Sequence, residues 1–214
     1  MIIESFPVGL LQCNCTIIGC PRTREALVVD PGGDVDRILQ TCESHGLKVT
    51  RIAHTHAHFD HVGGTSELQA KTGAEVLLHK DDLWLYEDLD GQCAMVGMPP
   101  LGLGTCPPLD AELEDRQDLT FGQQATHVLH TPGHTPGSCC FALRTPDGML
   151  LLAGDTLFRG SIGRTDFPRG DFDTIQGSIR ERLFVLESDT RVITGHGPET
   201  TIGWERQHNP FVRG

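Results

Sequence analysis

Short apolar runs alternate with amphipathic segments in the first part of the chain. The run EALVVD at 25–30 stops at Pro31-Gly32-Gly33, which is typical of a buried strand that ends in a turn. After it, apolar residues between positions 35 and 42 recur at the spacing of one helical face. The pattern predicts strands over 10–19, 25–30, 49–55 and 75–79, and helices between Asp34 and Gly46 and between Gly63 and Gly73. Strands that alternate with helices in this way indicate an α/β layer architecture.

The second half is patterned as hairpins followed by two helices. The turn Thr145-Pro146-Asp147-Gly148 separates two apolar runs. An apolar stripe from Ile175 to Leu186 predicts a helix that begins at Asp173. The predicted strands of this half are 119–130, 138–143, 149–153 and 191–194, and a short last helix is expected over 201–207.

Residues 88–116 interrupt the pattern. They contain two Pro-Pro pairs and four glycines between Gly91 and Gly104. Such a stretch is long for a connection inside a compact domain. Two interpretations stay open, a surface excursion and a lid over an active site.

Composition then limits the function. The chain has 214 residues, 38% of them hydrophobic, and a formal charge of −12, so we expect one domain over 1–214. The negative charge argues against nucleic acid as a partner, because phosphate binding needs a basic face. No apolar run approaches the ~20 residues that span a bilayer, and the N-terminus lacks a signal-peptide pattern. We therefore expect a cytoplasmic protein whose eight cysteines are reduced thiols.

A dense group of histidines follows the predicted strand 49–55, in the segment Thr55-His56-Ala57-His58-Phe59-Asp60-His61. Side chains alternate along an extended chain, so His56 and His58 would point the same way and could share one metal ion. The turn required by Gly63-Gly64 would direct Asp60 and His61 to a neighbouring position. His54 is expected to be a strand residue rather than a ligand.

Three further residues of metal-ligand type follow apolar runs. His134 lies in the tight loop TPGHTPGS, Asp155 follows the run 149–153, and His196 follows the run 191–194. In layered α/β folds, sites form at the rim where strands end. The sequence therefore places ligand residues from four separate elements at such a rim.

The number of ligands suits two metal ions. The predicted ligands are His56, His58 and His134 for one ion, Asp60, His61 and His196 for a second, and Asp155 as a bridge. Nitrogen and carboxylate ligands fit zinc, with iron or manganese as alternatives. Two ions about 3.5–4 Å apart can hold a hydroxide, because the metal lowers the pKa of its bound water toward ~7.

The order Thr-His-x-His-x-Asp-His, Gly-His, Gly-Asp and Gly-His-Gly resembles the metallo-β-lactamase superfamily over nearly the whole chain. The resemblance implies an α/β (α+β) fold, an αββα sandwich of two mixed β-sheets flanked by helices, with a dinuclear site at one edge. It also implies that all seven predicted ligands bind metal.

Details of the motifs resemble one branch of that superfamily. Asp155 stands where zinc β-lactamases typically have a cysteine, as in the glyoxalase II-like hydroxyacyl-thioester hydrolases. The segments 158–171 and 205–211 resemble the short, single-domain members of that group. The chain ends soon after His196, so we expect no equivalent of the C-terminal helical domain that holds glutathione in full-length glyoxalase II.

This resemblance implies a metal-dependent hydrolase whose partner is a small-molecule thioester, such as S-D-lactoylglutathione. A metal-bound hydroxide would attack the thioester carbonyl, with Asp60 and Asp155 as catalytic residues. A thiolate is a good leaving group, so no strong general acid is required. A non-enzymatic relative would be expected to have lost ligands, and none is missing.

The motif Gly163-Arg164-Thr165-Asp166-Phe167 supports an alternative function. Persulfide dioxygenases share it, and they hold a single iron at the positions of His56, His134 and Asp155. The second hypothesis is therefore a mononuclear-iron glutathione persulfide dioxygenase.

Arginines near this motif are candidates for substrate binding. Arg164, and less clearly Arg159, could pair with a carboxylate of the substrate. Alternatively, Arg164 ties its own loop to Asp166 or Asp171.

Overall fold

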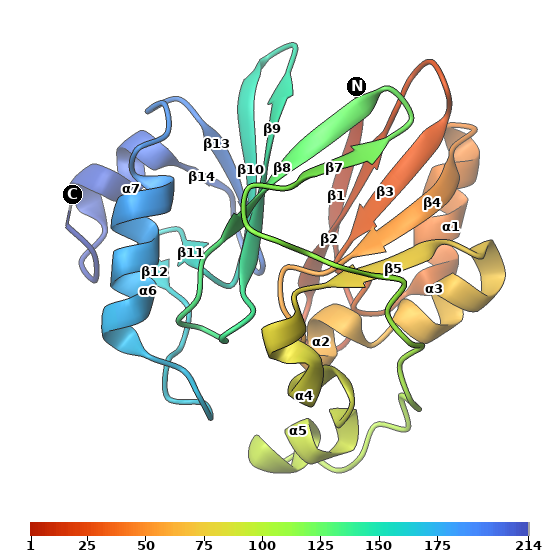
Figure 1. Cartoon of the computed structure of the whole chain (residues 1–214), viewed down its shortest axis with the longest axis horizontal. Helices are drawn as coiled ribbons and strands as arrows, with labels where there is room; N and C mark the ends of the chain where they lie inside the picture. Colours follow the sequence, from red (N-terminus) through yellow and green to blue (C-terminus); the bar gives the residue numbers. More distant parts are fainter. Residues whose placement is uncertain (214) are drawn as a thin grey trace. The chain divides into compact units, whose positions relative to one another are not determined.

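The computed structural model describes residues 1–213, and their contacts form two compact units. Unit 1 comprises residues 1–113 and 120–124, and unit 2 comprises residues 114–119 and those from 125 onward. Each unit has one six-stranded mixed sheet, and each is described by itself below (Figure 1).

The sheet of unit 1 follows the chain from one edge to the other. Its strands, in spatial order, are β1 (Ile2–Val8), β2 (Cys13–Gly19), β3 (Glu25–Val29), β4 (Lys48–Ala53), β5 (Glu75–Leu78) and β6 (Ala111–Glu112). The first three strands pair antiparallel, and β3 to β6 pair in parallel. The parallel strands β3, β4 and β5 correspond to the strands that the sequence predicts over 25–30, 49–55 and 75–79.

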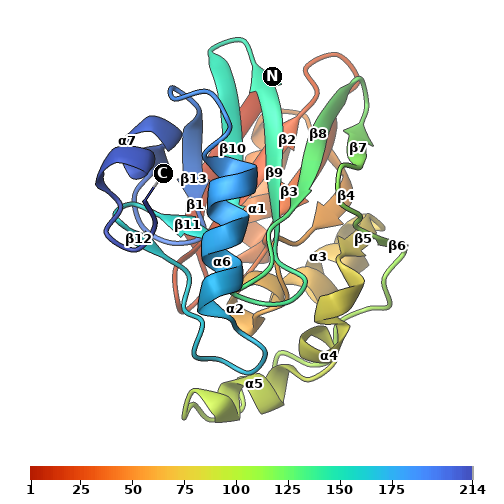
Figure 2. The same ribbon diagram turned by 60° about the vertical axis from the view of Figure 1, so that its left-hand side comes forward.

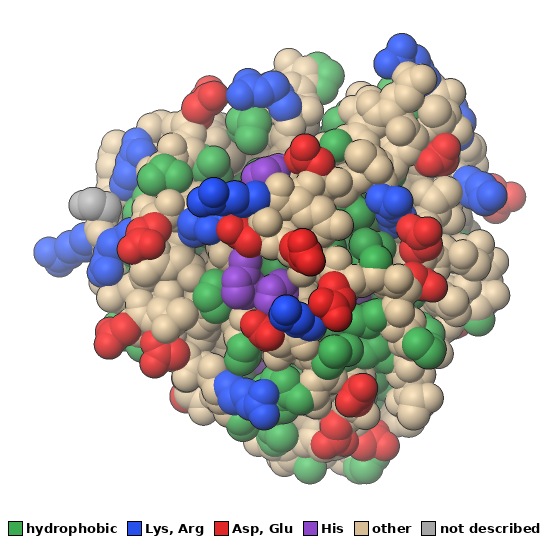
Figure 3. Space-filling view, in the orientation of Figure 1, with side chains coloured by type: hydrophobic (Ala, Val, Ile, Leu, Met, Phe, Trp, Pro, Cys, Tyr) green, Lys and Arg blue, Asp and Glu red, His purple; other side chains and the backbone are tan. Residues whose placement is uncertain are grey.

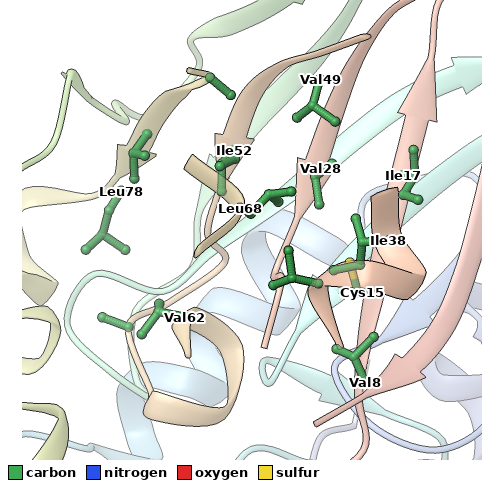
Figure 4. Packing of buried hydrophobic residues seen from close by; sticks show 14 of the residues in the cluster. Val8, Cys15, Ile17, Val28, Ile38, Val49, Ile52, Val62, Leu68 and Leu78 are labelled. Carbon is green, nitrogen blue, oxygen red and sulfur yellow. The ribbon is translucent and has the colours of Figure 1, made fainter. Parts of the chain in front are cut away.

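Helices follow the strands of this sheet along the chain. They are α1 (Val35–Ser44), α2 (Phe59–Val62) and α3 (Thr65–Thr72), followed by the 3-10 turn η1 (Lys80–Asp82), α4 (Leu83–Tyr86) and α5 (Leu89–Met95). Helices α1 and α3 contact β4 of the sheet, whereas α4 and α5 contact α2 and each other. Figure 4 shows Ile38 of α1 and Leu68 of α3 among Ile17, Val28 and Ile52 of the strands. The helical stripe predicted from position 35 onward is therefore the face that α1 buries.

The sheet of unit 2 has the order β14-β13-β10-β9-β8-β7. Its strands are β7 (Asp118–Phe121), β8 (Gln124–His130), β9 (Cys139–Thr145), β10 (Gly148–Gly154), β13 (Arg191–Thr194) and β14 (Thr200–Thr201). β10 and β13 are parallel, whereas β8 with β9, β9 with β10 and β13 with β14 are antiparallel. A separate small hairpin joins β11 (Leu157–Phe158) and β12 (Ser161–Ile162).

Two helical segments complete unit 2. Helix α6 (Phe172–Ser178) continues into a π-helical turn (Ile179–Leu183), and α7 (Ile202–His208) follows β14. Figure 2 shows α6 lying along β9 and β10. Ile175, Ile179 and Leu183 pack there in one core cluster with Cys140 and Leu151 of the sheet.

Several boundaries differ from the prediction. The strand predicted from residue 10 begins at Cys13, because Gly9 and Gln12 both have positive φ and form a turn. The single strand predicted over 119–130 is two strands, β7 and β8, interrupted at Gly122, whose φ is +57°. Strand β1 has no counterpart in the prediction.

Helix starts also differ. The helix predicted from Gly63 is preceded by the short helix α2, which begins at Phe59. Helix α6 begins after Asp171, not Asp173, because the Asp171 carboxylate accepts a hydrogen bond from the Thr174 amide at 2.7 Å. Asp34 does precede α1, but its carboxylate accepts from the Gly9 amide at 2.9 Å instead of capping the helix.

The stretch 88–116 contains α5 and β6, and residues 96–110 between them form no helix or strand. Hydrogen bonds connect its later part to the rest of unit 1. The Tyr86 hydroxyl donates to the Pro107 carbonyl at 2.9 Å, and the Val76 amide donates to Asp110 at 2.8 Å. Over residues 1–213, no helix is long and apolar enough to cross a membrane.

Candidate metal centre

Unit 1 presents two pairs of predicted ligand atoms in the segment that follows β4. The Nε2 atom of His56 lies 3.0 Å from Nδ1 of His58, and Oδ2 of Asp60 lies 3.7 Å from Nε2 of His61. Two atoms that each lie about 2.1 Å from one tetrahedral ion are about 3.4 Å apart. Both pairs therefore have the spacing of ligands that share an ion.

A buried carboxylate orients two of these histidines. Asp30, at the end of β3, accepts hydrogen bonds from the Thr55 amide and the Thr55 hydroxyl, both at 2.7 Å, and Nδ1 of His61 lies 3.0 Å from Oδ2. The Thr55 hydroxyl donates to Asp30, so it accepts from Nδ1 of His56 at 3.1 Å. Both imidazoles then carry their hydrogen on Nδ1, and the Nε2 lone pair is available to a metal.

Glycine 32 allows the loop after β3 to reach the ligand segment. A Cβ atom at Gly32 would lie 1.7 Å from the backbone oxygen of Asp60, and one at Gly64 would lie 2.5 Å from the oxygen of Pro31. These distances leave no room for a side chain. The Pro-Gly-Gly turn that ends β3 is therefore required for Asp30 to sit beside the histidines.

Unit 2 presents three predicted ligands, two imidazoles on either side of one carboxylate. Asp155 follows β10, and its Oδ2 lies 3.6 Å from Nε2 of His134 while its Oδ1 lies 3.8 Å from Nε2 of His196. These distances are too long for hydrogen bonds and close to the separation of two ligands on one ion. One oxygen faces each imidazole, so the carboxylate presents one ligand atom toward each histidine.

Backbone contacts fix this arrangement. Nδ1 of His134 donates to the carbonyl of Arg164 at 2.7 Å, and a carbonyl only accepts, so Nε2 again holds the lone pair. A Cβ atom at Gly195 would lie 1.9 Å from Oδ1 of Asp155. The glycine of the Gly-His-Gly motif therefore makes space for the carboxylate.

The donor set of both units fits divalent metal ions. Three of the histidines present Nε2 with Nδ1 held by a hydrogen-bond partner, which is the usual state of metal-bound imidazole. His54, which the sequence predicts to be a strand residue rather than a ligand, differs from these three. It lies one residue beyond β4, it is fully buried, and Nε2 lies 3.2 Å from the Thr65 hydroxyl. Burial lowers the pKa of His54 to about 4, so it stays neutral at ordinary pH.

The arginines are already engaged by neighbouring groups. Arg164 donates two hydrogen bonds to Asp166, at 2.9 and 2.7 Å, and its guanidinium lies over the Phe167 ring. These hydrogen bonds lower the pKa of Asp166 to about 2. Arg159 lies over the ring of Trp204. The structure thus shows the loop contact for Arg164, and the partner is Asp166 because Asp171 caps α6.

All eight cysteines are free thiols, and only Cys106 is partly exposed. Cys13 lies close to the segment 55–61, with Sγ 3.4 Å from Nδ1 of His61, and burial raises the pKa of the Cys13 thiol to about 12.

On the face drawn in Figure 3, acidic and basic side chains are interspersed, with no continuous basic patch there. That face offers no broad site for a polyanion.

Sequence reasoning missed Asp30, Asp82 and Gln92. Asp30 had a usable signal, because it stands at the end of an apolar strand as Asp155 does. Asp82 and Gln92 contact the ligand segment through its backbone amides and carbonyls. No local pattern marks such contacts, since they depend on how distant segments pack.

Comparison with known proteins gives the family. The sequence profile of the metallo-beta-lactamase superfamily matches residues 8–196. The hydroxyacylglutathione hydrolase GloC of Haemophilus influenzae is 38% identical over 222 residues, covering 99% of this chain and 98% of that protein.

Solved structures are similar to this chain over nearly its whole length. BLEG-1, described as a B3 metallo-beta-lactamase, has a TM-score of 0.89 and 36% identity, with 100% of both chains covered. TTHA1623, solved in a di-iron-bound form, has a TM-score of 0.85 and 37% identity over 98% of this chain and 100% of that one. ETHE1 from Myxococcus xanthus has a TM-score of 0.80 and 28% identity over 98% of this chain and 84% of its own. The chain therefore belongs to the metallo-β-lactamase superfamily and has its fold.

Proposed function

We propose that this protein is a metal-dependent hydrolase that cleaves thioesters such as S-D-lactoylglutathione. The proposed ligands are His56, His58 and His134 for one ion, Asp60, His61 and His196 for the other, and Asp155 as the bridge. We propose zinc as the metal, with iron as the first alternative because TTHA1623 is described in a di-iron-bound form and manganese as the second.

The position of Asp155 carries this proposal. Its two oxygens face His134 and His196 separately within unit 2. A carboxylate supplies two ligand atoms of this kind, whereas a cysteine in its place would supply one sulfur. The similarity to hydroxyacylglutathione hydrolase GloC adds support for a thioester substrate.

The bound metal ions would supply a nucleophile from water at neutral pH and would polarise the thioester carbonyl. The chain's own residues have narrower roles. Asp60 and Asp155 would orient the attacking water, and Asp30 would keep His56 and His61 in the metal-binding tautomer. Hydrolysis adds water across the C–S bond and releases a carboxylate, a thiol and a proton. Because a thiolate leaves readily, the reaction needs no strong acid from the protein.

The proposal includes a cytoplasmic setting and one functional domain over 1–214. Eight free thiols are expected in a reducing compartment. The family profile spans residues of both units, which supports their acting together.

A panel of three substrates tests the reaction class. Protein loaded with zinc, and separately with iron, would be given S-D-lactoylglutathione, glutathione persulfide with oxygen, and a β-lactam. We expect chelator-sensitive loss of the thioester absorbance and little turnover of the other two. Oxygen uptake with the persulfide by the iron form alone would instead support the dioxygenase alternative, which the Gly163–Phe167 motif suggests. Hydrolysis of the β-lactam alone would assign the activity named for BLEG-1.

A further inference from the structure

Two side chains outside the ligand set hold the backbone on both sides of His58. Gln92 of α5 accepts a hydrogen bond from the Phe59 amide at 2.9 Å and donates to the Ala57 carbonyl at 2.9 Å. Asp82 accepts a hydrogen bond from the Ala57 amide at 3.1 Å. Three polar groups of the backbone, next to a predicted ligand, are thus bonded to two side chains from residues 80–95.

The side-chain amide of Gln92 is buried, and both of its polar atoms are hydrogen-bonded. It is only 4% exposed, and its amide nitrogen also donates to the Leu85 carbonyl at 2.7 Å. The partners fix the orientation of the amide, because Phe59 N–H can only donate and the two carbonyls can only accept. An apolar residue here would leave one buried donor and two buried acceptors of the backbone without this partner.

Local structure delivers Gln92 to this position. The Asp88 carboxylate caps α5 by accepting a hydrogen bond from the amide of Gly91, the residue before Gln92, at 2.9 Å. Figure 1 shows α4 and α5 next to α2 within unit 1. The stretch after Asp88, which the sequence leaves as a surface excursion or a lid, thus begins with a residue that reaches the ligand loop.

We infer that Gln92 is a positioning residue of the metal centre, which it serves by fixing the peptide groups of Ala57 and Phe59 on either side of His58. His56 and His58 must keep their ligand atoms 3.0 Å apart for one ion to bind both. The peptide between them is held by Gln92 and Asp82, so loss of Gln92 widens the range of positions open to His58. The inference rests on the proposed function only in that the histidines bind metal.

Metal release measures this role without any thioester. Wild-type protein, Gln92→Met and Gln92→Asn would be loaded with zinc, and the rate of zinc transfer to an excess of a coloured chelator would be recorded. Met has a similar length and no hydrogen bonds, and Asn is one methylene too short to reach both Ala57 and Phe59. We expect release about tenfold faster in both, the lower end of the loss seen when groups that orient metal ligands are removed.

A stability control separates positioning from general destabilisation. Val49→Ala removes core volume in unit 1 and leaves the ligand loop intact, so zinc release should match wild type even if the melting temperature falls. Equal acceleration in Val49→Ala and Gln92→Met would overturn the inference, and so would unchanged release in Gln92→Asn. Amide exchange gives a second readout: the Phe59 amide should lose protection in Gln92→Asn, and retained protection would contradict the assignment.

The same experiment distinguishes failure of the proposed function. A wild-type protein that retains zinc but hydrolyses no thioester would refute the substrate and leave the release rates as a valid test. A wild-type protein that retains no metal would overturn both proposals.

Discussion

Asp30 and His61 form a buried pair in which Oδ2 of the carboxylate lies 3.0 Å from Nδ1 of the imidazole. Asp30 is 2% exposed and His61 fully buried. The carboxylate fixes the tautomer of His61 directly and that of His56 through the Thr55 hydroxyl. One residue outside the predicted ligand set therefore orients a predicted ligand in each of the two pairs that unit 1 provides.

Substitution of Asp30 by Asn should weaken metal binding without removing a ligand. An amide has one oxygen, so it cannot accept all three of the hydrogen bonds that Asp30 now accepts. We expect the affinity for metal to fall about 10- to 100-fold, measured by competition with a chelator. Asp36→Asn is the matched control, because Asp36 is an exposed partner of Lys71; an equal loss of affinity in both variants would contradict the role of Asp30.

Gly195→Ala should displace the Asp155 carboxylate. The added Cβ would lie 1.9 Å from Oδ1 of Asp155, which must move away from His196. We expect metal content to fall by about half or more in elemental analysis, with turnover reduced at least tenfold. Gly177→Ala meets nothing within 4 Å and lies inside α6, where alanine is favoured. That control should retain its metal, and wild-type metal content in Gly195→Ala would show that the carboxylate is not a ligand.

His58→Ala should abolish turnover and lower metal content. Unit 1 would lose one of the two nitrogens that lie 3.0 Å apart. Of the three histidines proposed for this ion, only His56 and His134 would remain, together with the bridging Asp155. Elemental analysis and the thioester assay would be run on the same preparation. An unaffected rate would rule out His58 as a ligand.

The Arg164–Asp166 pair predicts a pH dependence in the acid range. The folded pKa of Asp166 is about 2, below the ordinary 3.8, because Arg164 donates hydrogen bonds to the carboxylate. The unfolded chain therefore takes up the proton first, so the pair's small contribution is present above pH 3.8 and is lost as the pH falls toward about 2. An NMR titration should show the pKa of Asp166 near 2, and near 3.8 in Arg164→Met.

Kinetics of Arg164→Met test whether Arg164 binds a carboxylate of the substrate. Since the guanidinium already binds Asp166 and lies over Phe167, we expect KM for the thioester to change less than threefold. A tenfold rise in KM with unchanged kcat would instead assign Arg164 to binding of a substrate carboxylate.

The regular elements were predictable where the apolar pattern is clear. Helix α1 was found because its buried residues recur at helical spacing, and strands β3 and β5 because they are short, nearly continuous apolar runs. Strand β1 was not, because its residues are mostly half-exposed and it contains Pro7 at the edge of the sheet. The turn inside the strand predicted over 119–130 was missed, because Gly122 is the only strong turn residue in that range.

The candidate ligands could be named from the sequence because they come shortly after predicted strands. The roles of Asp30 and Gln92 depend on contacts with residues 25 to 35 positions away along the chain. A single sequence contains no local signal for such contacts. The same limit applies to Arg164, whose pairing with Asp166 was one of two alternatives until its geometry was known.

The most direct test of the central claim is a titration of activity against metal equivalents. Metal-free protein would receive zinc in steps, and hydrolysis of S-D-lactoylglutathione would be followed by loss of the thioester absorbance, with a chelated sample as control. The account predicts turnover that rises to a plateau at two equivalents per chain and disappears with chelator. Saturation at one equivalent, or no turnover with two ions bound, would contradict a dinuclear thioester hydrolase.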